Sequence, residues 1–143
     1  MLRKVAMLAL LGEIVAAPAE AGTIGGVMYK DPGCGCCDGH AAALRRAGMD
    51  IAVVPTGNDV SVQARRAVPE ALRGCQTTIV GGYAVEGHVP VNVVQRMLRE
   101  KPAIRGIALP GMPSGSPGMA GPKTAPFKVL SFGPAGTKVY AIE

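Results

Sequence analysis

The sequence has 143 residues, of which 48% are hydrophobic and 17% charged, which excludes a disordered chain and predicts one folded core. The formal net charge is +5, but the aromatic residues are only three Tyr and two Phe, too few for the stacking surfaces of single-stranded nucleic-acid binders. We therefore expect no nucleic-acid partner.

The first 21 residues have the layout of a secretory signal peptide. A basic pair, Arg3 and Lys4, precedes an apolar run over residues 5–11, and small residues close the segment at Ala21. The apolar run is shorter than the roughly 20 residues needed to cross a bilayer, so we expect no membrane insertion after cleavage. Cleavage after Ala21 predicts a periplasmic chain that begins at about Gly22.

The rest of the chain alternates between β-prone and helix-prone segments. The predicted elements, in chain order, are a strand over 24–30, a helix from the cysteines to Gly48, a strand over 50–54, a helix over 60–67 continuing irregularly to Gly74, strands over 77–80 and 83–86, and a helix over 91–101. The order βαβαββα predicts an α/β fold, a thioredoxin-like domain over residues 22–105.

Residues 106–143 form a predicted C-terminal extension packed on that domain and contributing to metal binding. In residues 106–122, nine of seventeen are Gly or Pro, a composition that predicts neither a helix nor a central strand. Two β-prone runs, 127–132 and 137–142, are separated by Gly and Pro and predict a closing hairpin.

The strongest chemical signal is the run Cys34-Gly35-Cys36-Cys37, between a predicted strand end and a predicted helix start. Helix amides at such a junction stabilise thiolates, which are both nucleophiles and metal ligands. Cys34 and Cys37 make a C-x-x-C pair able to cycle between dithiol and disulfide. Three soft sulfurs on one turn also favour a thiophilic ion, with Cu(I) and Zn(II) as the main candidates.

Two methionines in the Gly/Pro segment favour copper over zinc. Met112 and Met119 stand seven residues apart, and neutral thioether sulfur is a ligand that Cu(I) accepts and Zn(II) rarely uses. A strap carrying both could fold back over the thiolates. The alternative is that they fill gaps in the core.

Three further residues are candidates at the same site. Cys75 is either a fourth sulfur ligand or half of a structural disulfide with one of the other cysteines. His88 stands in a loop position from which an imidazole can coordinate a metal, or is simply exposed. His40, almost one helical turn after Cys37, is either a ligand or a group that raises thiolate character.

Three sequence blocks together carry a family resemblance. They are YKDPGCGCC at 29–37, VGGYAVEGHVP at 80–90 and IRGIALPGMPSGSPGM at 104–119. In these blocks the chain resembles the CopG-like copper-resistance proteins of Gram-negative bacteria, small exported proteins with a C-x-C-C motif. The resemblance implies a thioredoxin-like domain with a C-terminal extension, a cysteine-bridged cluster of several copper ions, and interconversion of Cu(I) and Cu(II) in the periplasm.

Carried over by position, the metal ligands are Cys34, Cys36 and Cys37, with Cys75, His88, Met112 and Met119 at matching positions. The chain departs from the family where relatives often carry His, since Ala43 and Gln76 stand at those places. If either His is a ligand in relatives, this chain binds fewer ions or relies on His40. The chain also lacks the Pro that usually precedes the third strand of thioredoxins.

The leading hypothesis is a periplasmic copper-binding redox protein in copper resistance, a candidate copper oxidoreductase, expected to be a monomer, with copper ions and a periplasmic exporter or electron-transfer protein as partners. A second hypothesis is a Cu(I) carrier or sequestering protein without turnover. A third is a metal-free thiol-disulfide oxidoreductase working through Cys34 and Cys37, and a fourth is a structural zinc site.

Overall fold

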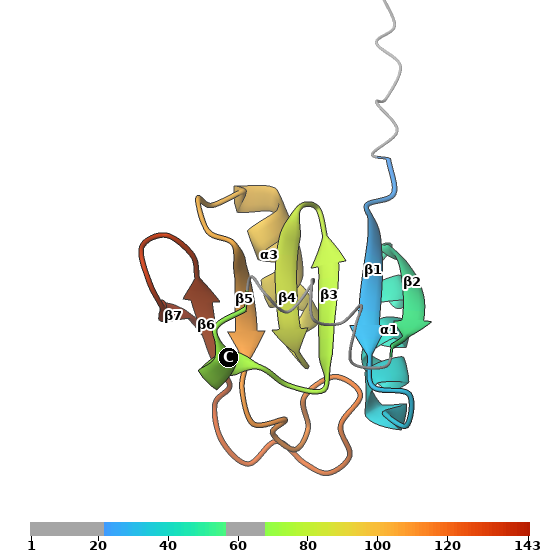
Figure 1. Ribbon diagram of the computed structural model, residues 1–143. Coiled ribbons are helices and arrows are strands. Elements are labelled where there is room, and N and C mark those ends of the chain that lie inside the picture. The colour runs from blue at the N-terminus through green and yellow to red at the C-terminus, as the bar shows by residue number, and fades with distance from the viewer. Residues whose placement is uncertain (1–21, 57–67) are drawn as a thin grey trace, which may run out of the picture.

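The computed structural model describes residues 22–56 and 68–143. The expected signal peptide over 1–21 and the expected helix over 60–67 lie outside the described residues. The elements of the described part are β1 (Gly25–Lys30), α1 (Gly35–Arg46), β2 (Asp50–Pro55), a 3-10 turn η1 (Glu70–Leu72), β3 (Gln76–Val80), β4 (Tyr83–Gly87), α3 (Val91–Glu100), β5 (Gly106–Leu109), β6 (Lys128–Phe132) and β7 (Lys138–Ile142) (Figure 1).

These strands form one mixed sheet in the order β2-β1-β3-β4-β5-β6-β7. The pairs β1–β2 and β4–β5 are parallel, and the other neighbouring pairs are antiparallel. The result is a mixed α/β architecture consistent with the predicted thioredoxin-like fold. Each predicted strand from 24–30 to 83–86 corresponds to an observed strand, with ends that differ by one residue.

The main core lies between the sheet and the two helices. Leu44 of α1 and Met97 of α3 are fully buried in the same cluster as Met28 of β1 and Val85 of β4. Ala84, the neighbour of Val85, belongs to a second cluster on the opposite face with η1, because successive strand residues point to opposite faces. Both faces of β4 are therefore buried, and its C-terminal end enters the protein interior.

Helix α1 begins directly at the cysteine motif. Cys34 is its N-cap residue, so Cys36 and Cys37 lie in the first turn. The alanine-rich stretch that follows favours the helix, and Gly48, at a φ of 89°, stands just past its end, as the sequence predicts. The helix thus holds the cysteines at its N-terminus, beside the C-terminal end of β1.

The expectation that residues 106–122 contain no strand is wrong for the first four of them. Strand β5 is buried along its length between β4 and β6. Its apolar run, Ile107–Leu109 in the sequence, is short enough to be masked by the surrounding Gly and Pro. Gly106 is required at its start, because a side chain there would collide with the carbonyl oxygen of Ala84 and the ring of Phe132.

Candidate metal centre

A buried lysine fixes the turn that carries the cysteines. Lys30, only 5% exposed, donates from Nζ to the carbonyl oxygen of Cys34 at 2.9 Å and forms an ion pair with Asp38 at 2.7 Å. These contacts tie the end of β1 to both sides of the helix start. Lys30 is not among the site residues predicted from the sequence, although a lysine that ends an apolar strand next to the motif is a usable signal.

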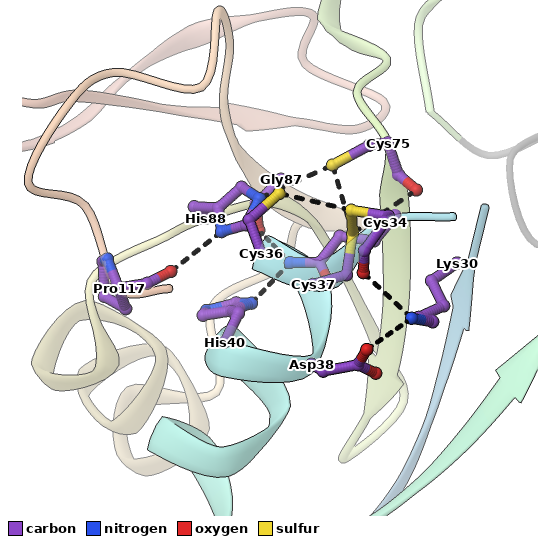
Figure 2. Close-up of a disulfide and its surroundings, with 11 residues drawn as sticks. Lys30, Cys34, Cys36, Cys37, Asp38, His40, Cys75, Gly87, His88 and Pro117 are labelled. Carbon is purple, nitrogen blue, oxygen red and sulfur yellow. Dashed lines mark hydrogen bonds and ion pairs between the residues drawn. A yellow bond between two sulfur atoms is a disulfide. The ribbon is translucent and has the colours of Figure 1, made fainter. Parts of the chain in front are cut away.

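The four cysteine sulfurs gather in one place, all within 4.8 Å of one another (Figure 2). Cys34 and Cys37 form a disulfide, and Cys36 and Cys75 are free thiols. Cys36 Sγ lies 3.3 Å from Cys34 Sγ, and Cys75 Sγ lies 3.3 Å from Cys37 Sγ. The alternative that Cys75 pairs in a structural disulfide is therefore not what the structure shows, since the bond forms within the C-x-x-C pair.

Cys75 is held at the start of β3 by a buried carboxylate. Glu86, fully buried on β4, accepts hydrogen bonds from the amide of Gly74 at 2.5 Å and from the hydroxyl of Thr77 at 2.5 Å. The bonds flank Cys75 and fix its backbone. Burial, together with the neighbouring Cys36, raises the pKa of the Cys75 thiol to about 11, so the free thiol is protonated at neutral pH.

His88 points one ring nitrogen at this sulfur cluster. Its Nδ1 donates a hydrogen bond to the carbonyl oxygen of Pro117 at 2.8 Å, which leaves the lone pair on Nε2. Nε2 lies 3.5 Å from Cys75 Sγ. The ring is fully buried, and this burial lowers the pKa of His88 and favours the neutral form that metal coordination requires.

His40 is also buried, but both of its ring nitrogens have protein partners. Nε2 donates to the carbonyl oxygen of Val89 at 3.0 Å, and Nδ1 accepts from the side-chain amide of Gln76 at 2.6 Å. Burial lowers the pKa of His40 to about 4. Its ring lies 5.5 Å from that of His88, so His40 packs beside the candidate ligand with no lone pair directed at the sulfurs.

The Gly/Pro segment passes directly over the first turn of α1. Gly118, at a φ of 88°, lies so close to the helix that a side chain would collide with the backbone of Cys36 and His40. Met119, the next residue, is half-buried, and Met112 stands at a φ of 45° with 41% of its surface exposed. The ligand roles of both methionines remain predictions.

Two solved forms of a protein titled "Copper resistance protein copG" superpose with TM-scores of 0.76 and 0.75 at 31% sequence identity. The match covers 85% of this chain and 98% or 99% of theirs. The chain belongs to the CopG family of copper resistance proteins.

A family model described as "Protein of unknown function, DUF411" matches residues 72–119. The matched region contains four of the predicted CopG ligand positions: Cys75, His88, Met112 and Met119. No curated protein sequence matches the chain significantly. Among the described residues, no helix is long and apolar enough to span a membrane.

The residues that position the CopG site were not predicted from the sequence. Besides Lys30 and Glu86 these are Gln76, noted only as a departure from the family pattern, and Pro117, whose contribution is a backbone carbonyl. A single charged residue, Glu86, in the otherwise uncharged strand β4 was a readable signal. The carbonyl of Pro117 had none, because main-chain contacts across 29 residues leave no mark on residue type.

Proposed function

We propose that this chain is a periplasmic copper-binding protein of copper resistance that holds several copper ions on its cysteines and interconverts Cu(I) and Cu(II). The observation that carries the proposal is the clustering of four sulfur atoms within 4.8 Å of one another. Cys34, Cys36, Cys37 and Cys75 supply these donors once the disulfide is reduced.

The donor set fits copper better than zinc. Thiolates and thioethers are soft ligands that suit Cu(I), and the solved relatives are titled copper resistance proteins. Three of the cysteines lie on one turn, which fits a single tetrahedral zinc poorly. Bridging sulfurs shared between several ions relieve this crowding. Bound copper would supply the one-electron chemistry, and the chain would hold the ions and limit their access to water.

His88 completes the ligand set in this proposal. A metal-bound imidazole usually donates its other N–H to a carbonyl or carboxylate, which fixes the tautomer and the ring orientation. The bond from His88 to Pro117 meets this description, and Nε2 faces the sulfurs. The Gly/Pro segment also brings Met119 next to α1. We assign Met119 and Met112 as thioether ligands of the copper ions.

Thiol-disulfide exchange is a second candidate, because Cys34 and Cys37 form a disulfide. Oxidoreductases of this kind use a Pro before β3 to receive the substrate, and this chain has Cys75 immediately before that strand. The free thiols of Cys36 and Cys75 also have no role in the mechanism of such an enzyme. A Cu(I) carrier that passes the ion to an exporter shares the ligands of the leading proposal and differs only in lacking turnover.

Copper loading under controlled redox conditions tests the proposal. The reduced protein is reconstituted with Cu(I) under nitrogen, its metal content is determined, and visible absorption is followed as an oxidant and then a reductant are added. Several copper ions per chain with a reversible absorption change support the redox role. Copper bound without reversible change indicates the carrier, and no copper retained against a chelator indicates thiol-disulfide exchange.

A further inference from the structure

The sulfur cluster contains a pair of cysteines that can exchange two electrons, a property that copper binding alone does not use. Cys34 and Cys37 form a disulfide, while Cys36 and Cys75 in the same cluster are thiols. Two of the four sulfur donors are therefore withdrawn from metal binding by one covalent bond. The disulfide state and the fully reduced state therefore differ by two electrons and by two of the four cysteine thiols.

The free thiols are not placed at random around this bond. Cys36 Sγ lies 3.3 Å from one disulfide sulfur, and Cys75 Sγ lies 3.3 Å from the other. His88 Nε2 lies 3.5 Å from Cys75. Cys36, Cys75 and His88 would therefore hold a copper ion next to the sulfurs that give up or take back electrons.

From this arrangement we infer that the Cys34–Cys37 dithiol is the electron donor that reduces Cu(II) to Cu(I). Two Cu(II) ions each accept one electron, the two thiols lose two protons, and one sulfur-sulfur bond forms between Cys34 and Cys37. The products are two Cu(I) ions and the disulfide seen in the structure. The inference rests on the proposed copper binding and adds the source of the electrons.

The same step lowers the affinity of the chain for Cu(I), its product. Formation of the disulfide removes two of the four cysteine ligands, so Cu(I) keeps Cys36, Cys75, His88 and the thioethers. A ligand that prefers the reduced protein is released by oxidation. An acceptor of Cu(I) therefore receives the ion more readily after turnover. Reduction of Cu(II) and release of Cu(I) are thereby coupled through the same pair of sulfurs.

The disulfide is open to reduction from one side. Cys34 is half-buried and Cys37 is fully buried, so an external dithiol protein attacks the Cys34 sulfur and expels the Cys37 thiolate. The leaving sulfur belongs to the first turn of α1, at the positive end of the helix dipole, which favours a thiolate. The external dithiol becomes a disulfide, and the chain regains its two thiols.

The test uses the full chain, reduced, freed of reductant and mixed under nitrogen with two equivalents of Cu(II) and a chromogenic Cu(I) chelator. We expect two Cu(I) ions and the loss of two thiols per chain. Free thiols are alkylated with one reagent before reduction and the released thiols with a second, and tandem mass spectrometry of the tryptic peptide 31–45, which carries Cys34, Cys36 and Cys37, assigns the new disulfide to Cys34 and Cys37. A disulfide that involves Cys36 or Cys75, or Cu(II) reduced with no disulfide formed, overturns the inference.

A variant and a binding measurement complete the test. Cys34→Ser lowers the initial rate of Cu(I) production several-fold, with folding checked by circular dichroism, and an unchanged rate overturns the inference. Cys37→Ser provides a second variant if the first does not fold. Cu(I) supplied directly to the reduced chain separates the two claims: binding without Cu(II)-driven disulfide formation overturns only the electron source, whereas absence of Cu(I) binding overturns the proposed function as well.

Discussion

The imidazole of His88 donates a hydrogen bond from Nδ1 to the backbone carbonyl oxygen of Pro117, 29 residues away in the chain, at 2.8 Å. The bond joins the end of β4 to the Gly/Pro strap and determines which ring nitrogen faces the cysteines. The strap therefore acts on the candidate metal centre through its backbone, whether or not its methionines bind copper.

His88→Ala is expected to lower the affinity for Cu(I) by about 10-fold or more, because it removes an oriented nitrogen donor. Competition with a Cu(I) chelator measures this loss. The matched control is His40→Ala, which removes a buried histidine whose ring nitrogens already bind Val89 and Gln76. It should destabilise the fold and leave the number of copper ions unchanged. Equal copper loss in both variants would contradict the assignment of His88.

The buried His40 makes the metal-free protein sensitive to acid. Its pKa of about 4 in the folded chain lies below the ordinary value of 6.5, so between these pH values the unfolded chain binds more protons than the folded one. The free energy of unfolding should therefore fall by roughly 3 kcal/mol as the pH drops from about 7 to 4. The lowered pKa of His88 acts in the same direction.

Urea unfolding at a series of pH values measures this dependence. The variant His40→Gln has no titrating group at that position and should show a flatter profile between pH 7 and 4. A His40→Gln profile as steep as that of the parent chain would exclude His40 as the cause.

Glycine at position 118 is needed for the approach of the strap to α1. Gly118→Ala places a methyl group against the backbone of Cys36 and His40 and should lower both the melting temperature and the retention of copper. Gly121→Ala is the matched control: its φ of 86° gives a similar backbone cost of roughly 1 kcal/mol, but its methyl group would meet only the side chain of Ser114 at 3.5 Å. Similar losses in the two variants would show that the close contact is unimportant.

Cys75 should react slowly with alkylating agents. Its pKa of about 11, against an ordinary value of 9.0, lowers the thiolate fraction at neutral pH by roughly 100-fold. We expect iodoacetamide to modify Cys75 far more slowly in the folded chain than in urea, as followed by mass spectrometry. Because copper must displace this proton, copper affinity should fall as the pH is lowered. Equal alkylation rates in the folded and unfolded chains would contradict the raised pKa.

The sequence predicted the parts of the fold that depend on local pattern. The strand before the cysteines, the helix that begins at them and the capping glycine Gly48 are all observed. Strand β5 was missed because its pairing with β4 and β6 is decided by distant partners, while the local composition is dominated by Gly and Pro.

For the site, residue type predicted the sulfur cluster well. Three cysteines on one turn predict the cluster, and the structure brings Cys75 and His88 to the same place. Residue type could not predict which cysteines form the disulfide, because the sulfur of each cysteine lies close to those of the other three. Nor could residue type show which histidine is the better candidate ligand. The structure shows that both ring nitrogens of His40 have hydrogen-bond partners, whereas Nε2 of His88 faces a sulfur.

The copper content of Cys36→Ser beside that of the parent chain tests the central claim most directly. Both proteins are reduced, loaded with Cu(I) under nitrogen, passed over a desalting column and analysed for metal per chain. A multinuclear site bridged by cysteine sulfurs predicts several copper ions in the parent chain and fewer in the variant. The same copper content in both would contradict a site in which the cysteines of the C-x-C-C turn share the ions.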